Sequence, residues 1–216
     1  MRRLLLVRHA STDAVRAAAF GADEPLDAAG VVAAARLRGR LPRAAEVLVS
    51  PAVRARATAA RAGLRVSAVD AALAECDFGA WAGLPLRAVQ EQALRAWMSD
   101  PDFSPPGGES LSALLARVGD WLAAQASRSG TAVAITHGGV IKAAVVTALA
   151  APPAAFWRID IAPLSITELH AHDGRWTVAR VNDREERPTA GAGGQGTAPA
   201  GDHAAVMPAG PREVVA

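Results

Sequence analysis

The feature that most constrains this chain is an apolar run near the N-terminus that ends abruptly in polar residues. Residues 4–7 (Leu-Leu-Leu-Val) are followed directly by Arg8 and His9. Four consecutive apolar residues without a turn-forming residue predict a fully buried strand of the kind found inside a parallel sheet. The arginine and the histidine then lie at the carboxyl end of that strand, where open α/β sheets bind their ligands.

The rest of the chain alternates expected strands and helices and ends in short segments with polar–apolar alternation. An Asp173-Gly174 turn joins the last two of these segments into a hairpin. This order predicts a three-layer α/β/α sandwich with a mostly parallel mixed sheet. We expect strands at 44–49, 64–69, 131–136, 158–161, 165–170 and 175–181, and helices at 28–41, 52–62, 85–98, 109–126 and 140–150.

Two of the later strands also end in residues that carry chemistry. Arg54 lies in the first turn of the helix after the second strand, and His137 with Gly138 and Gly139 follows the strand before the last long helix. If these strands are neighbours of the first one, two arginines and two histidines converge on one crevice. Arginine forks and helix N-termini both bind phosphate oxygens, so the crevice is predicted to bind a phosphate dianion.

Composition narrows the possible partners and compartment. The single cysteine, Cys76, excludes an internal disulfide and a cysteine-based metal site. Lys142 is the only lysine, and the arginines are scattered, so the net charge of +2 does not indicate nucleic-acid binding. No apolar run reaches the roughly 20 residues of a membrane span, and the N-terminal run is too short for a secretory signal. A cytoplasmic protein that does not bind membranes is therefore expected.

The 216 residues divide into one expected domain and a tail. Residues 1–182 have enough apolar sequence for one core. Residues 183–216 consist mainly of glycine, alanine, proline and charged residues with almost no large apolar side chain, so we expect them to be disordered.

Five motifs, in their usual order along the chain, resemble those of the histidine phosphatase superfamily, branch one. This superfamily shares one fold between phosphoglycerate mutases and small-molecule phosphatases. The motifs lie at residues 6–12 (LVRHAST), 50–58 (SPAVRARAT), 75–83 (ECDFGAWAG), 106–110 (PGGES) and 136–139 (THGG).

The resemblance implies a phosphohistidine mechanism with a role for each central residue. His9 is the implied nucleophile, while Arg8, Arg54 and His137 would hold the phosphate oxygens, with the Gly138 backbone amide beside them. A neutral imidazole is an adequate nucleophile near pH 7, and covalent capture divides one difficult displacement into two easier ones. A ring of cations neutralises the phosphoryl charge without a metal or other cofactor.

Glu75 is the implied proton donor, because a carboxyl group on a separate loop, away from the arginines, can protonate the leaving alkoxide. Asp77 is the competing candidate two residues later. Two further residues have alternative interpretations. Thr12 either caps a turn or binds phosphate, and Glu109 is either a helix-start charge or a substrate contact.

The chain departs from the family pattern at three positions. Ala10 replaces the usual glycine after the nucleophile, so the backbone there should avoid positive φ. Val15 replaces an asparagine that reaches the phosphate in many members, and Ala82 replaces a common glutamate. The loss of two polar groups is expected to weaken or redirect substrate recognition.

The expected function is a metal-independent phosphomonoesterase that acts on a small phosphorylated metabolite, with inorganic phosphate as the other ligand. The short segment between Glu75 and His137 is more like the phosphatases, including the α-ribazole phosphatases, than the mutases.

A phosphoglycerate mutase and a non-catalytic phosphate-binding regulatory domain are the alternatives. A metal site of His9, His137 and Glu75 is disfavoured because two guanidinium groups would repel the cation. The sequence does not indicate whether the protein is a monomer or a homodimer.

Overall fold

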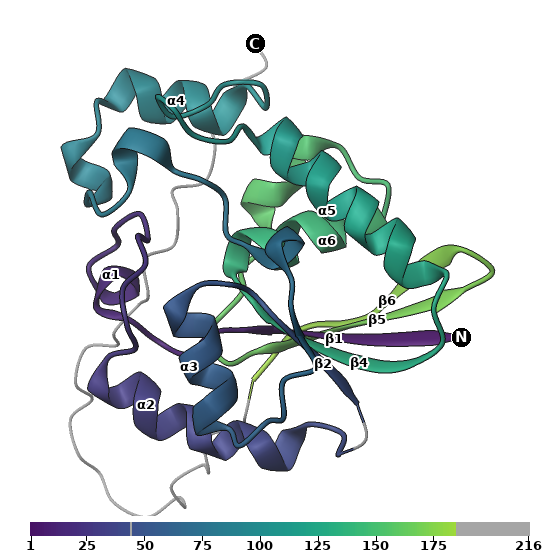
Figure 1. The fold of residues 1–216 in the computed structure, drawn as a ribbon. Helices are drawn as coiled ribbons and strands as arrows, with labels where there is room; N and C mark the ends of the chain where they lie inside the picture. The colour runs from purple at the N-terminus through teal and green to yellow at the C-terminus, as the bar shows by residue number, and fades with distance from the viewer. Residues whose placement is uncertain (44, 185–216) are drawn as a thin grey trace, which may run out of the picture.

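The computed structural model describes residues 1–43 and 45–184, which form a six-stranded mixed sheet with helices on both faces (Figure 1). The predicted three-layer α/β/α sandwich is therefore confirmed. Four strands are parallel, and the last two are antiparallel additions at one edge. The strands, in the spatial order β3-β2-β4-β1-β5-β6, are β3 (Ala68–Val69), β2 (Glu46–Val49), β4 (Gly130–Thr136), β1 (Arg2–Arg8), β5 (Ile166–His172) and β6 (Arg175–Asp183).

The helices divide between the two faces of the sheet. Helices α2 and α3 pack on one face and α5 and α6 on the other, while α4 lies beyond α5 at the top of the view (Figure 1). Among the described residues no helix is both long and apolar enough to cross a membrane. The bounds are α1 (Asp13–Arg16), α2 (Ala28–Ala34), α3 (Val53–Arg61), α4 (Glu91–Ser99), α5 (Leu111–Ala126) and α6 (Gly138–Ala148).

Side-chain alternation in β1 divides the core into two layers and sets the direction of the residues that follow. Leu4 and Leu6 are buried with the α5 and α6 side chains, whereas Leu5 and Val7 are buried with α3 side chains and with Leu37 of the 3₁₀ helix that follows α2. Because successive side chains of a strand point to opposite faces, Arg8 continues toward α6 and His9 toward α3. One strand end thus supplies side chains to both sides of the region at the carboxyl ends of β1 and β4, which we call the crevice.

The crevice itself results from the strand order. β1 and β4 are parallel neighbours, yet the chain leaves β1 toward α1 and α2 on one face and leaves β4 into α6 on the other. Connections that separate in this way leave room at the carboxyl ends of the two strands. His137, which directly follows β4, therefore lies beside the end of β1.

Several element boundaries differ from those predicted. The expected strand at 158–161 is wrong, because Pro152 and Pro153 begin a 3₁₀ helix (Pro153–Arg158) and irregular chain follows it. The expected strand at 64–69 shortens to two residues, since it lies at the sheet edge and pairs only with β2. Two expected helices contain 3₁₀ helix, at Ala35–Arg40 and at Leu86–Ala88. The helix expected from residue 109 begins at Leu111, after Ser110 as its N-cap.

Capping and turn residues adopt the local conformations that they favour. Asp27 caps α2 by accepting a hydrogen bond from the Gly30 N–H at 2.6 Å. Asp173 and Gly174 both adopt positive φ, as a two-residue hairpin turn requires. β6 includes Asp183, one residue beyond the predicted domain boundary, and the tail from residue 185 onward lies outside the described residues.

Candidate active site

His9 is buried at the end of β1 and is held in one orientation. Its Nδ1 lies 2.7 Å from the carbonyl oxygen of Ala10, and its Nε2 lies 3.2 Å from Nε of Arg54. An arginine Nε can only donate, so Nε2 of His9 must be the acceptor and Nδ1 must carry the proton. The lone pair available for chemistry is therefore on Nε2.

Helix α3 also fixes the backbone next to His9. The Ala10 N–H donates to the Thr58 hydroxyl at 3.0 Å, and that hydroxyl donates to the Arg54 carbonyl at 2.7 Å. Ala10 does not adopt a positive φ, as its replacement of glycine predicts. Ala10, whose carbonyl orients His9, is thus attached through its N–H to the helix that carries Arg54.

Arg54 is buried and forms the α3 wall of the crevice. Its guanidinium donates to the Ala22 carbonyl at 2.5 Å and lies 3.7 Å from the Glu24 carboxylate. Glu24 in turn accepts from the Thr12 hydroxyl at 3.0 Å, while that hydroxyl accepts from the Val15 N–H as the cap of α1. The structure places Thr12 in its capping role, and its contact with phosphate stays a prediction.

His137 faces His9 from the end of β4. The two ring centroids are 5.0 Å apart with an interplanar angle of 63°. His137 Nε2 lies 2.7 Å from the Ser50 hydroxyl, and its buried Nδ1 has no hydrogen-bond partner among the described residues. When Ser50 donates to Nε2, Nδ1 carries a proton with no acceptor, which suits an incoming anion.

Arg8 lies on the α6 side of the crevice. One guanidinium nitrogen donates to the Ile161 carbonyl at 2.5 Å, whereas Nε is buried without a partner among residues 1–43 and 45–184. A side chain at Gly138 would come within 3.5 Å of that Nε, so the first residue of α6 adjoins the guanidinium. Arg8 and the α6 N-terminus therefore face the same region.

Burial and positive neighbours keep both histidines neutral. Burial is the main cause that lowers the pKa of His9 well below its usual 6.5, and His137, Arg8 and Arg54 lower it further. Burial also lowers the pKa of His137 well below 6.5, with Arg54, Arg8 and Arg117 adding to the effect. The crevice thus holds two cationic guanidiniums and two neutral imidazoles near pH 7, which matches a phosphate dianion.

Glu75 approaches this group from the loop before α4. Its carboxylate accepts from the Gly139 N–H at 3.3 Å, in the first turn of α6. Among the described residues it forms no ion pair, although its charge raises the pKa of Arg8 against the larger lowering by burial. Asp77, the competing carboxylate, accepts from the Gly79 N–H at 2.9 Å in a local turn.

Three residues at or beside the site were not given a role from the sequence. Ser50 orients His137, Glu24 pairs with Arg54, and Arg117 binds Glu109 through two nitrogens at 3.0 and 2.8 Å. The ion pair supports the structural interpretation of Glu109. Ser50 is the first residue of the motif at 50–58, so its place in the motif could have indicated a role at the site. The sequence contains no comparable signal for the pairings of Glu24 and Arg117, because these depend on the folded chain.

A metal site of His9, His137 and Glu75 was the alternative interpretation of these residues. A transition-metal site needs several histidine, cysteine or carboxylate ligands around one point. The part of the chain that the structure describes contains no group of three or more such residues arranged to hold a metal ion.

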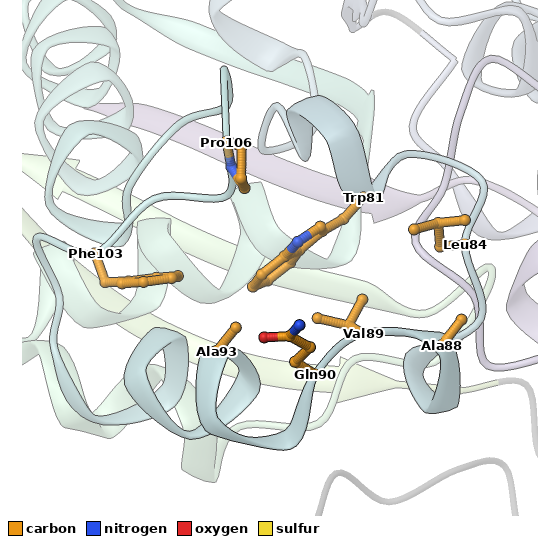
Figure 2. Close-up of a pocket in the computed structure, with 8 residues that line it drawn as sticks. All are labelled: Trp81, Leu84, Ala88, Val89, Gln90, Ala93, Phe103 and Pro106. Atoms are coloured by element: carbon orange, nitrogen blue, oxygen red, sulfur yellow. The ribbon is translucent and has the colours of Figure 1, made fainter.

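An aromatic cluster packs around Phe20, close in sequence to the residues that contact Arg54. Phe20 packs on Phe78, Trp81 and Trp97 at centroid distances of 5.0 to 5.5 Å, and Phe20 is followed by the loop that contacts Arg54. Figure 2 shows the Trp81 indole pointing into a cavity of about 300 Å³, with Phe103 on one side of it. Phe20, Trp81 and Trp97 are buried, and the lining of this cavity is mainly apolar.

The family model of the histidine phosphatase superfamily (branch 1) matches residues 4–184. A bifunctional protein of Mycobacterium tuberculosis is 37% identical over 195 residues, which are 83% of this chain and 53% of that protein. An uncharacterized protein of Mycobacterium bovis gives the same values. The chain therefore spans about half the length of the curated relatives it matches.

Solved structures show the same fold. A mycobacterial glucosyl-3-phosphoglycerate phosphatase in complex with VO3 is 30% identical, with a TM-score of 0.73 and coverage of 85% of this chain and 100% of that one. A Thermus thermophilus protein is 34% identical, with a TM-score of 0.67 and coverage of 82% and 97%. A phosphoserine phosphatase of Entamoeba histolytica, 20% identical with a TM-score of 0.77 and coverage of 84% and 97%, supports the fold alone. This chain belongs to the histidine phosphatase superfamily, branch 1.

Proposed function

We propose that this protein is a phosphoric monoester hydrolase that acts on a small phosphorylated metabolite. The observation that carries the proposal is the state of His9, a neutral imidazole with Nδ1 bound to a carbonyl and an unprotonated Nε2 that faces Arg54, its ring centroid 5.0 Å from that of His137. The glucosyl-3-phosphoglycerate phosphatase at 30% identity supports the same class of reaction.

In the first proposed step, Nε2 of His9 attacks the phosphorus atom. The nitrogen–phosphorus bond forms while the bond from phosphorus to the ester oxygen breaks. Arg8, Arg54 and the Nδ1–H of His137 bind the phosphoryl oxygens, which carry most of the charge of the transition state. Glu75, in its protonated form, donates its proton to the leaving alkoxide, and the alcohol departs.

In the second proposed step, water releases the phosphoryl group. The Glu75 carboxylate takes a proton from the water as the water attacks phosphorus, and the nitrogen–phosphorus bond breaks. Inorganic phosphate leaves, and both His9 and the protonated Glu75 are regenerated. The guanidiniums supply the charge neutralisation, so neither step requires a metal ion.

His9→Ala tests the proposal, because it removes the nucleophile and leaves the phosphate-binding residues in place. We expect this variant to bind inorganic phosphate but to lose hydrolysis of nitrophenyl phosphate by more than about 10³-fold at saturation. The wild type should form an acid-labile, alkali-stable phosphoenzyme in rapid quench with labelled substrate, and a chelator should leave its turnover unchanged.

Each alternative function has its own signature in the same experiment. Inhibition by chelator that Mg²⁺ or Zn²⁺ reverses would show that a metal is required. A long-lived phosphoenzyme with exchange between 2- and 3-phosphoglycerate would show a mutase, and phosphate binding without turnover would show a binding domain. A panel of α-ribazole 5′-phosphate, glucosyl-3-phosphoglycerate, phosphoserine and 3-phosphoglycerate then ranks the substrates.

A further inference from the structure

The loop that carries Glu75 is attached to helix α5 through one arginine. The guanidinium of Arg117 donates through a single nitrogen to two backbone carbonyls, those of Ala72 at 2.8 Å and Ala74 at 3.0 Å. Ala74 immediately precedes Glu75 in the chain. The backbone on the N-terminal side of Glu75 is therefore fixed to Arg117.

Glu109 attaches the backbone on the other side of Glu75. Its own N–H donates to the Asp77 carbonyl at 2.7 Å, and its carboxylate accepts from the Asp77 N–H at 3.4 Å. The Cys76 thiol lies 3.5 Å from the Glu109 carbonyl. Because Glu109 also holds Arg117 through two nitrogens, one ion pair clamps the chain both before and after Glu75.

The base of this clamp is part of the core. Leu114, Val118 and Trp121 of α5 are buried, so the helix cannot shift without disturbing the packing. Trp121, one turn after Arg117, donates its indole N–H to Asp70 at 2.8 Å, at the start of the same loop. Half-burial and the bond to Glu109 act in opposite directions on the pKa of Arg117, and the net effect raises it, so the charge is permanent.

An open cavity of about 350 Å³ also lies beside the loop and is bordered by Glu75, Asp77, Glu109 and Arg117. A carboxyl group that donates a proton in one step and accepts one in the next needs a route to solvent. The clamp therefore fixes the Glu75 backbone without sealing the carboxyl from water.

We propose that Arg117, oriented by Glu109, is the positioning residue for the general acid of the active site, holding Glu75 at the N-terminus of α6. The inference rests on the proposed function, because it presumes that Glu75 protonates the leaving group. Arg117 acts through Glu75 and takes no part in binding the phosphoryl group.

Substrates with different leaving groups separate this role from a structural one. An alkyl phosphate needs the acid, whereas nitrophenolate leaves well without a proton. Glu75→Gln, the reference variant, should lose roughly 10²–10⁴-fold on the alkyl substrate and much less in the single-turnover release of nitrophenolate. Arg117→Met should show the same selectivity, with an alkyl loss of about 10–100-fold and a nitrophenolate burst within about threefold of wild type.

Three further variants sharpen the test. Arg117→Lys keeps the charge but cannot hold two carbonyls and a carboxylate together, so it should restore little of the alkyl activity. Glu109→Gln, a milder change, should cause the same loss to a smaller degree and serves if Arg117→Met does not fold. Arg61→Met, which removes an exposed arginine from the end of α3, should leave both substrates unaffected.

Combining Arg117→Met with Glu75→Gln decides whether the two act together. If Arg117 works only through Glu75, the double variant should lose little more alkyl activity than Glu75→Gln alone. Three results would overturn the positioning role while the proposed function stands. The losses of the two single variants could multiply in the double variant, Arg117→Met could lose equally on both substrates, or Arg117→Lys could recover the full alkyl activity. If Glu75→Gln itself shows no leaving-group selectivity, the acid assignment fails and this inference fails with it.

Discussion

At the scale of single residues, the two histidines of the crevice differ in the hydrogen-bond partners of their ring nitrogens. His9 has Nδ1 against a carbonyl and Nε2 beside Arg54, whereas His137 has Nε2 against Ser50 and Nδ1 without a described partner. The first arrangement leaves a lone pair for attack, and the second leaves a proton for an anion. Two identical side chains thus gain different proposed roles from the neighbours of their ring nitrogens.

Gly139 is the residue at which the smallest change should have a selective effect. A Cβ there would overlap the Glu75 carboxylate, which is the movable end of a side chain. Gly139→Ala should therefore displace that carboxylate without straining the backbone, and alanine also has the better helix propensity. We expect alkyl phosphate turnover to fall by about 10–100-fold with no decrease in melting temperature.

Gly119→Ala is the matched control for this substitution. Gly119 also lies inside a helix, and a Cβ there would meet only the Thr147 side chain at an ordinary 3.7 Å. Its turnover should equal that of the wild type. Unchanged alkyl turnover in Gly139→Ala would mean that Glu75 does not need its observed position.

At the scale of elements, polar residues at one end of the sheet form the candidate site, and those at the other end form a network that joins elements. The carboxyl end of β1 carries the crevice, and the opposite end carries Arg2, which is only 2% exposed. Arg2 donates to Glu46 at 2.7 Å, to Gln125 at 2.7 Å and to the Ser129 carbonyl at 3.0 Å. This network joins β1 to β2 and to the end of α5.

Arg2→Met should therefore reduce stability without changing chemistry. Removing one partner of a buried charged network leaves the others unsatisfied and costs about 3 kcal/mol in the free energy of unfolding. Urea unfolding measures this loss, and saturated turnover should be unaffected. Arg95→Met, which breaks the exposed pair with Glu91 on α4, should cost less than about 1 kcal/mol. Equal costs for the two variants would show that the network contributes no more than a surface pair.

At the scale of the whole molecule, the two buried histidines make the free energy of unfolding depend on pH. Both His9 and His137 have pKa values well below 6.5 when folded, because of burial and the arginines. Between the folded value and 6.5 the unfolded chain binds more protons than the folded one, so stability rises with pH in that window. This contribution is fully present above about pH 6.5 and is lost as pH falls.

Unfolding free energies measured from pH 7.5 to pH 5 test this dependence. Each buried histidine should contribute a decrease of up to about 1.4 kcal/mol per pH unit below 6.5. Glu168, whose pKa Arg3 lowers to about 2, contributes only below about 4.5 and lies outside the window. A variant with glutamine at positions 9 and 137 should have a flatter profile, and stability that increases on acidification would contradict the account.

The sequence by itself determined the features that depend on local pattern. The apolar runs predicted two buried strands, which are β1 and β4 in the structure. Arg8, His9 and His137 were therefore placed correctly at the carboxyl ends of these strands. The backbone preference of its two residues located the Asp173-Gly174 turn. These signals are carried within a few residues, so they do not require the rest of the fold.

Only the tertiary structure decided the features that depend on distant segments meeting. The pairing of Arg117 with the Glu75 loop and the contact between Ser50 and His137 join residues far apart in sequence. The prediction of a strand at 158–161 was wrong for the same reason: its polar–apolar alternation is real, but no strand among the described residues pairs with it. Periodicity reports which face of a segment is buried, whereas strand order and packing determine which atoms it meets.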